Sequence, residues 1–340
     1  MKKLWNKILT GVLFALLLLV PCACGGEKSI DSMIDRTAKS LQKSFESDEK
    51  QVLEDEKALP AGSAGSDWTA MVLSFSGRTD AYGDYLERLE QYVGQEYEKK
   101  GCLSDIKATE YHRIGLTMLA LGGDPSCVKL ADRTVNLVAD GTWNFKGGSP
   151  GIQGSNGLIY ALILLDAKDY TSDLEARDIE QSIIKELLGY QKESGSFCID
   201  NSLGGDIDIT AMAVQALAQH TSDLEVERAV EKALDWLSGQ LTDDVVFQYS
   251  GEGSAESSAQ MILALCAVGI DPEEDERFQK DGKNVLDGMD NFRMKDGLYM
   301  HSMEDGEASI MATYQSLLAL EAVQRLREDG TWIFDFTERE

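Results

Sequence analysis

The chain has 340 residues, of which 43% are hydrophobic, and its 59 acidic and 32 basic residues give a formal net charge of −27. This length and apolar content are enough for one large domain or two small ones. The excess of acidic residues makes nucleic acid and anionic lipid headgroups unfavourable partners, so no nucleic-acid partner is expected.

The first 23 residues are typical of a targeting segment. Three lysines precede an apolar run over residues 8–20, which is short for a membrane span and typical of a secretory signal. Cysteines and glycines follow, in a pattern that resembles a bacterial lipoprotein signal. The resemblance implies acylation of Cys24, with Cys22 as the alternative, and an extracytoplasmic protein held at the cell membrane by this lipid alone. Cleavage without lipidation would instead give a secreted protein.

Residues 24–65 are predicted to form a tether, an outer helix and a linker. Apolar residues recur at loosely helical spacing within an otherwise polar stretch. Glycine, serine and proline then lead into the first apolar helix. The remaining residues, 66–340, are assigned to one domain.

One strongly apolar helix organises this domain. Nearly every residue of 209–218 is apolar or small, which predicts a helix that is buried on all sides. Weaker copies recur five times, so the domain consists of six repeats. The residues that mark the same position in each copy are Thr69, Ile114, Gly157, Thr210, Ser258 and Thr313.

Amphipathic helices are predicted between the buried ones. The clearest covers residues 223–240, where apolar residues form one stripe and charged residues face away. Similar stretches cover residues 82–97, 124–138, 173–190 and 274–289. Alternating amphipathic and buried helices are accommodated by two concentric rings, which predicts an all-α fold, an (α/α)6 toroid.

The loops that precede the buried helices are rich in glycine and aromatic residues. In such a toroid, all of them lie at one end, where six helix N-termini with unpaired amide groups converge and form a mouth. We expect ligand-binding residues there. The candidates are Asp67, Trp68, His112, Trp143, Phe145, Asn156, Phe197, Asp208, Glu256, Tyr299 and His301.

The segment 188–197 resembles the repeat of terpenoid cyclases and protein prenyltransferases, known as the prenyltransferase and squalene oxidase repeat. It has glutamine, then glycine and then an aromatic residue before a buried helix. The resemblance covers about residues 66–326 and implies the α/α toroid fold. It implies no single function, because this fold serves many activities.

The resemblance to class II terpene cyclases implies a proton donor at Asp208, with Asp206 as the second catalytic candidate. These enzymes need a strong acid beside a second carboxylate. The family's acidic motif is broken here, since its last acidic position is Ile209, and aromatic residues make up only 8% of the chain. A degenerate cyclase-like enzyme is therefore an alternative only.

Other members of the superfamily are distinguished by metal, thioester or cofactor sites. Prenyltransferases bind zinc through Asp, Cys and His, and none of the three histidines has the expected cysteine-rich surroundings. The internal thioester motif is absent. The resemblance of 208–217 to transcobalamin-type carriers implies corrinoid binding, but no closing β domain follows. The sequence thus predicts no metal and no cofactor.

Glycosidases and polysaccharide lyases also use (α/α)6 barrels and need paired carboxylates across a groove. A carbohydrate-active enzyme is therefore the main alternative, and an aromatic shelf beside the pair would favour it. The acids that could supply the pair are Asp67, Asp206, Asp208, Glu256 and Glu307.

The first hypothesis from the sequence is an exported, lipid-anchored toroid that binds a ligand at its mouth without catalysis. The ligand would be a small molecule, a glycan or a surface protein. This hypothesis combines an intact scaffold with the missing zinc ligands, the missing thioester and the broken acidic motif.

Overall fold

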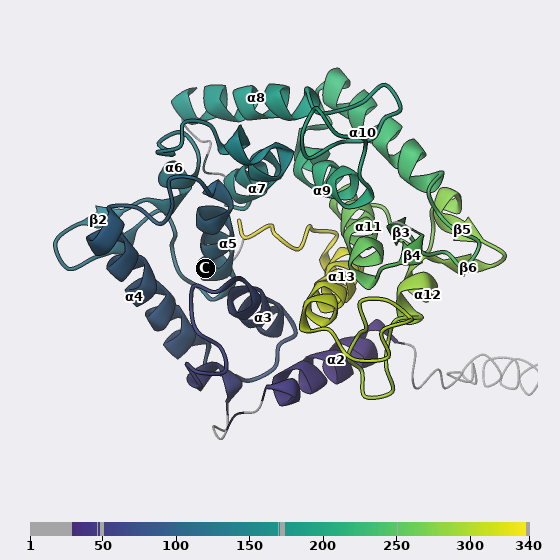
Figure 1. Cartoon of the computed structure of the whole chain (residues 1–340), viewed down its shortest axis with the longest axis horizontal. Coiled ribbons are helices and arrows are strands. Elements are labelled where there is room, and N and C mark those ends of the chain that lie inside the picture. The colour runs from purple at the N-terminus through teal and green to yellow at the C-terminus, as the bar shows by residue number, and fades with distance from the viewer. Residues whose placement is uncertain are drawn as a thin grey trace, which may run out of the picture.

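A computed structural model describes residues 29–45, 47, 51–168, 170, 174–249 and 251–337 (Figure 1). The targeting segment expected over residues 1–23 and both candidate lipidation sites, Cys22 and Cys24, lie outside these residues. Across the described part of the chain, every helix is too short or too polar to cross a membrane.

Six inner helices of the described chain form a closed ring. Each contacts the next one along the chain, and the last contacts the first (Figure 1). They are α3 (Ala64–Phe75), α5 (Ala108–Ala120), α7 (Ser155–Asp166), α9 (Ile207–Leu217), α11 (Ala255–Ala267) and α13 (Ile310–Asp329). These are the six apolar repeats, which need enclosure on all sides because they have no broad polar face. The predicted all-α toroid is confirmed.

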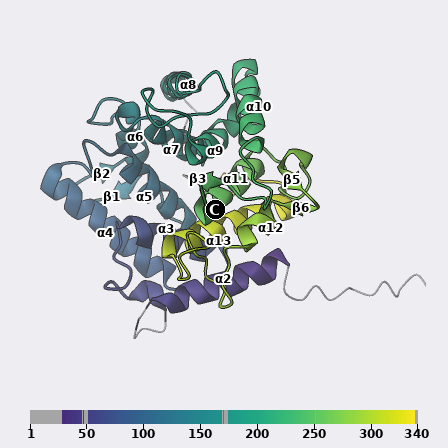
Figure 2. The same ribbon diagram turned by 45° about the vertical axis from the view of Figure 1, so that its right-hand side comes forward.

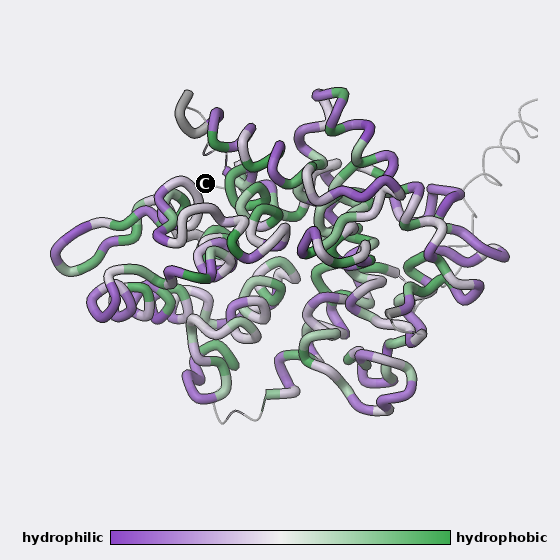
Figure 3. Tube along the Cα trace, turned by 45° about the horizontal axis from the view of Figure 1, so that its top comes forward, coloured by the Kyte–Doolittle hydropathy of each residue, from purple (hydrophilic) through white to green (hydrophobic). Residues whose placement is uncertain are grey.

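Four further helices of the described chain pack outside this ring, and hydrophilic residues gather along them while the inner helices are more hydrophobic (Figure 3). They are α2 (Ile30–Ser44), α4 (Tyr82–Lys100), α8 (Leu174–Leu188) and α10 (Leu224–Ser238). Three of them match the amphipathic stretches predicted over residues 82–97, 173–190 and 223–240. In α10, the predicted stripe from Val226 to Leu237 is the buried face.

Two of the predicted outer helices are wrong. A hairpin of β1 (Val128–Lys129) and β2 (Thr134–Val135), followed by the short α6 (Leu137–Gly141), replaces the helix expected over 124–138. The helix expected over 274–289 is replaced by four short elements. These are η4 (Glu276–Phe278), β5 (Gln279–Lys280), β6 (Lys283–Asn284) and α12 (Val285–Asp290).

Turn chemistry explains the second of these errors. Asp281 and Gly282 lie between β5 and β6 with φ angles of 50° and 77°. An Asp-Gly pair with two positive φ angles is the preferred two-residue hairpin turn, and it stops a helix. Asn284 then caps α12 with a reciprocal capping box to Asp287. The spacing of apolar residues alone did not reveal this signal.

The glutamine, glycine and aromatic motif of segment 188–197 connects one repeat to the next. Gln191 donates to the carbonyl oxygens of Gly195, at 2.9 Å, and of Ala229 on α10, at 2.8 Å. Gly195 has φ of 99°, and a Cβ atom there would lie 2.3 Å from the carbonyl oxygen of Lys232. Only glycine allows this close approach to the next outer helix. The register residue Thr210 then holds the loop, since its hydroxyl accepts the amide of Phe197 at 2.9 Å.

The helix expected within residues 24–65 is α2, which packs against α13 (Figure 2). The loop before α13 makes the same kind of close contact with α2 that the loop before α9 makes with α10. Gly297 has φ of 101°, and a Cβ atom there would lie 2.9 Å from Cγ of Arg36 on α2. Arg36 also donates to the carbonyl oxygen of Lys295. Among the described residues, α2 therefore completes the outer ring.

The segment after α13 crosses the ring (Figure 1). The amide of Phe336 donates to the carbonyl oxygen of Ala167, which follows α7, at 2.8 Å. Trp332, Phe334 and Phe336 are all buried. The chain end thus covers the end of the ring where the inner helices terminate. The other short elements are η1 (Val52–Glu54), η2 (Pro150–Gln153), η3 (Ala218–His220), β3 (Gln248–Tyr249) and β4 (Glu252–Gly253).

Candidate functional site

A cavity of about 690 Å³ opens where α7, α9, α11 and α13 begin. We call it the mouth cavity. The inner helices and the loops before α11 and α13 supply its lining. The lining residues are Asn156, Tyr160, Asp206, Asp208, Met212, Glu252, Gly253, Ser254, Glu256, Ser257, Gln260, His301, Met311 and Gln315. Five of these, Asn156, Asp206, Asp208, Glu256 and His301, are candidates from the sequence.

Asp208 lies in the first turn of α9 and is largely enclosed. Its Oδ1 atom is buried without a hydrogen-bond partner. Burial raises the pKa of this carboxyl, and the charges of Asp206 and Glu256 raise it further, while a hydrogen bond from Ser257 and the charge of His301 oppose them. The net effect raises the pKa of Asp208, which favours a protonated carboxyl that can donate a proton.

Glu256 lies in the first turn of α11 and is only 6% exposed. Its Oε2 atom accepts hydrogen bonds from Ser254 Oγ at 3.1 Å and His301 Nδ1 at 2.8 Å. Its Oε1 atom, like Oδ1 of Asp208, is buried without a partner. Neighbouring inner helices therefore each place one carboxylate with a free oxygen at the mouth cavity.

His301 comes from the loop before α13, and its side chain is 55% exposed. The hydrogen bond to Glu256 raises its pKa, helped by the charges of Glu256, Asp305 and Glu252 and opposed by burial. The imidazole is therefore a donor to Glu256 rather than an acceptor. It holds one oxygen of this carboxylate and leaves the other free.

Asp206 also lines the mouth cavity, but its side chain has a second role. Its Oδ1 atom accepts the amide of Ile209 at 2.9 Å and so caps α9. An aspartate at this position stabilises the helix start. Of the two catalytic candidates from the sequence, Asp208 is the one with a free buried oxygen.

Three glutamines from neighbouring inner helices form a ladder below the carboxylates. Gln215 donates to Oε1 of Gln260 at 2.9 Å, and Gln260 donates to Oε1 of Gln315 at 3.0 Å. Gln260 and Gln315 line the mouth cavity and also a smaller cavity of about 60 Å³. Amide groups at this depth can bind hydroxyl or carbonyl groups of a ligand.

Aromatic rings close the bottom of the smaller cavity. Its lining includes Trp68, Tyr160 and Phe334. The ring centroid of Trp68 lies 6.0 Å from that of Tyr160 and 6.4 Å from that of Phe334. Because Phe334 belongs to the segment that crosses the ring, the space below the mouth ends blindly. Trp68, a candidate from the sequence, thus contributes to the floor.

Asp67 and His112, also candidates, lie away from the mouth cavity and are fully buried. Asp67 accepts hydrogen bonds from Arg113 Nε at 2.9 Å and Tyr85 Oη at 2.8 Å. Nε2 of His112 is 2.7 Å from the carbonyl oxygen of Gly141. Burial lowers the pKa of His112 to about 4, so the imidazole is neutral and donates this bond. Both side chains connect elements of the scaffold.

The candidate aromatic residues from the loops pack under those loops. Phe197 and Tyr299 are fully buried, and each amide is held by a register threonine, Thr210 or Thr313. Phe145 is buried edge-on against a tyrosine of α5. Trp143 packs half-buried against the core. None of these four is among the described residues that line the mouth cavity, so they do not form the aromatic shelf considered from the sequence.

Several lining residues were missed by the sequence analysis, although a signal for them exists. Met212, Gln260 and Gln315 each lie two residues after a register residue of an inner helix. A glutamine in an otherwise apolar, buried helix requires a polar partner. Repeated at one register position, such glutamines mark an interior polar surface. Tyr160 and Met311 carry no comparable signal.

No protein-family model matches the chain, and no curated protein matches it. Solved structures do match. Unsaturated glucuronyl hydrolase from Bacillus sp. GL1, responsible for the degradation of glycosaminoglycan, is 13% identical with a TM-score of 0.57, covering 90% of this chain and 98% of that one. Candida albicans protein geranylgeranyltransferase-I complexed with GGPP is 10% identical with a TM-score of 0.56, covering 86% and 92%.

A third structure, of UGL with dGlcA-Glc-Rha-Glc, is 13% identical, covers 91% of this chain and 98% of that one, and has a TM-score of 0.54. The fold is an α/α toroid. At these identities the likeness extends to the fold alone, so the activity of this toroid has to be argued from its own residues.

Proposed function

We propose that this toroid is a carbohydrate-active enzyme that hydrolyses a glycosidic bond in the mouth cavity. The observation that carries the proposal is the pair Asp208 and Glu256, each with a buried carboxylate oxygen that has no partner. A buried polar atom without a hydrogen-bond partner lowers the stability of the folded protein, and such atoms are typical of functional sites. A bound substrate would supply the missing partners.

Asp208 is the proposed general acid. Its raised pKa favours the protonated form, which would donate its proton to the oxygen of the leaving group as the bond from this oxygen to the anomeric carbon breaks. Glu256 is the second carboxylate, which either removes a proton from the attacking water or bonds to the anomeric carbon before water arrives. In both cases water is consumed and one sugar leaves with a new hydroxyl group.

The lining favours a neutral or cationic sugar. Four carboxylates, Asp206, Asp208, Glu252 and Glu256, face the mouth cavity with His301 as the one basic side chain among the described lining residues. The chain as a whole is also strongly acidic. An anionic uronate or a diphosphate would meet repulsion here. The amides of Asn156, Gln260 and Gln315 suit hydroxyl groups.

The structural neighbours include a hydrolase. The same scaffold serves a hydrolase responsible for the degradation of glycosaminoglycan. The alternative of a terpene cyclase-like enzyme has less support, because Tyr160 is the one aromatic ring among the described residues that line the mouth cavity. Stabilisation of carbocations would require more aromatic faces.

The test is turnover by the full chain of aryl glycosides with poor leaving groups, whose departure needs a proton, with neutral, amino and uronic sugars in both anomeric forms. We expect release of the aryl alcohol from a neutral or amino sugar. Asp208→Asn should lower kcat by about 10² to 10⁴-fold, because it removes the acid but keeps the shape. Asp223→Asn is the matched control, since it makes the same change at the cap of the outer helix α10, where asparagine caps as well as aspartate does.

Saturable binding of a sugar without turnover would overturn the enzymatic proposal and favour the non-catalytic toroid considered from the sequence. Turnover that survives Asp208→Asn would overturn the role of Asp208. We further propose an extracytoplasmic location with a lipid anchor on Cys24, on the strength of the N-terminal sequence alone.

A further inference from the structure

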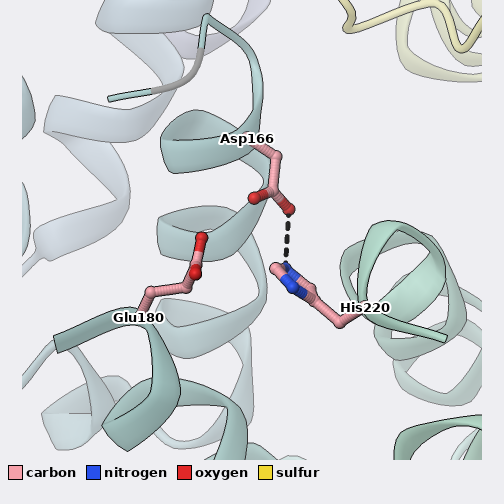
Figure 4. Close-up of side chains that lie close together, drawn as sticks. All are labelled: Asp166, Glu180 and His220. Carbon is pink, nitrogen blue, oxygen red and sulfur yellow. Dashed lines mark hydrogen bonds and ion pairs between the residues drawn. The ribbon is translucent and has the colours of Figure 1, made fainter. Parts of the chain in front are cut away.

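A second cluster of ionisable side chains lies at the far end of the toroid from the mouth cavity. Asp166 ends α7, Glu180 lies on α8, and His220 ends η3 (Figure 4). One ligand atom from each of the three lies within 4.8 Å of the others. Nε2 of His220 is 3.0 Å from Oδ2 of Asp166. Figure 4 shows the side chain of Glu180 directed toward this pair.

The donor set suits a divalent cation of the zinc class. Zinc binds imidazole nitrogen and carboxylate oxygen at about 2.0 to 2.2 Å, and three protein ligands with one water are a common set. In a tetrahedral site with such bonds, the ligand atoms are about 3.4 Å apart. The ligand atoms of His220 and Asp166 are 3.0 Å apart, slightly closer than this spacing, and all three ligand atoms lie within 4.8 Å of one another, so small side-chain shifts would bring them to it.

The surroundings allow an ion to enter and keep a water ligand. The side chains of His220 and Asp166 are 13% and 16% exposed, and Glu180 is 9% exposed. Asp166 also lines a cavity of about 140 Å³ beside the segment that follows α13. A site that is shielded yet reachable meets a requirement for metal binding. Two carboxylates with one neutral imidazole would also balance the charge of a divalent ion.

We propose that Asp166, Glu180 and His220 bind one divalent zinc-class cation, which holds α8 against the inner ring. The structure supports a fastening role because the three ligands come from three elements, of which α8 is an outer helix that packs chiefly on α7. The sequence predicted no metal, since these ligands are widely separated along the chain and form no spacing motif. The site is independent of the proposed hydrolysis.

The experiment is titration of the metal-free full chain with Zn²⁺ by calorimetry and with Co²⁺ by visible absorption. We expect one ion per chain and a cobalt spectrum without a thiolate charge-transfer band, which separates this site from the cysteines. His220→Gln and Glu180→Gln should each weaken binding by more than about 100-fold, because even outer-shell changes cost about 10 to 100-fold. Zinc should also slow hydrogen exchange in α8.

His301→Gln is the matched control, since it removes the other histidine that pairs with a carboxylate. It should leave zinc affinity unchanged. Absence of binding to the wild-type chain would overturn the proposal, as would equal affinity in all three variants. Circular dichroism of each variant checks that lost binding does not come from unfolding.

Discussion

Phe334 lies edge-on against Trp68, with their ring centroids 6.4 Å apart, and so joins the end of the chain to the first inner helix. Trp332 also packs edge-on against Phe334, with their ring centroids 5.4 Å apart. Both are buried. The contact closes the ring at the end opposite the mouth cavity and makes the interior a blind space.

Phe334→Ala should therefore destabilise the whole domain. Deletion of a buried phenylalanine ring typically costs about 3 to 5 kcal/mol, through lost burial and the cavity left behind. Urea unfolding measures this loss. Thr337→Ala, three residues further along and exposed, is the control and should have little effect. Equal stability of the two variants would show that the segment is not part of the cooperative fold.

Arg113→Met should strongly destabilise the protein because it leaves the carboxylate of Asp67 buried without its cation. Nε of Arg113 is 2.9 Å from Oδ2 of Asp67, which is fully buried. Loss of one partner of such a pair costs about 3 to 5 kcal/mol. Arg78→Met removes the more exposed pair with Asp35 and should cost less than about 1 kcal/mol. Chemical denaturation measures both losses. A larger loss of stability in Arg78→Met than in Arg113→Met would contradict this prediction.

The free energy of unfolding should depend on pH through His112. Burial lowers its pKa in the folded protein from 6.5 to about 4, so the unfolded chain takes up a proton first as the pH falls. This contribution is complete above pH 6.5 and is lost between pH 6.5 and about 4, with a total of about 3 kcal/mol. His112→Gln should have a flatter profile in this window. Identical slopes for both proteins would exclude the effect.

Asp206→Asn should move the alkaline limb of the pH–rate profile to lower pH. The charge of Asp206 helps to raise the pKa of Asp208, so its removal makes the proposed acid lose its proton earlier. Activity at acidic pH should be retained, because asparagine preserves the cap of α9. A limb that stays in place would mean that another group donates the proton.

Fatty-acid labelling in a bacterial host tests the N-terminal anchor. We expect label on the wild-type chain and on Cys22→Ala, and none on Cys24→Ala, because the sequence pattern favours the second cysteine. Label that depends on Cys22 would reassign the modified residue. An unlabelled wild-type protein in the medium would support secretion without an anchor.

The sequence predicted the inner ring because each of its helices is apolar nearly all round, and such helices can only be stable when enclosed. Six repeats with the same register, each with a buried and an amphipathic helix, then predicted two concentric rings of helices. The outer ring was less predictable. At residues 274–289, the Asp281-Gly282 turn decided the local structure, although the apolar spacing resembled that of a helix.

The candidate site was found only in part. Asp208 and Glu256 were recognisable from their positions at helix starts, and His301 from the loop before an inner helix. Asp67 and His112 also lie at helix starts but belong to the scaffold. The difference is made by neighbours from other repeats: Arg113 neutralises Asp67, whereas Asp208 and Glu256 keep one oxygen free.

The amino-acid pattern by itself determined the fold class, the number of repeats and the end of the ring that holds the mouth cavity, because these follow from local periodicity. The tertiary structure decided which carboxylates lack partners, that Phe334 closes the floor, and that Asp166, Glu180 and His220 meet. These relationships depend on distances between residues far apart in the chain, and packing alone sets such distances.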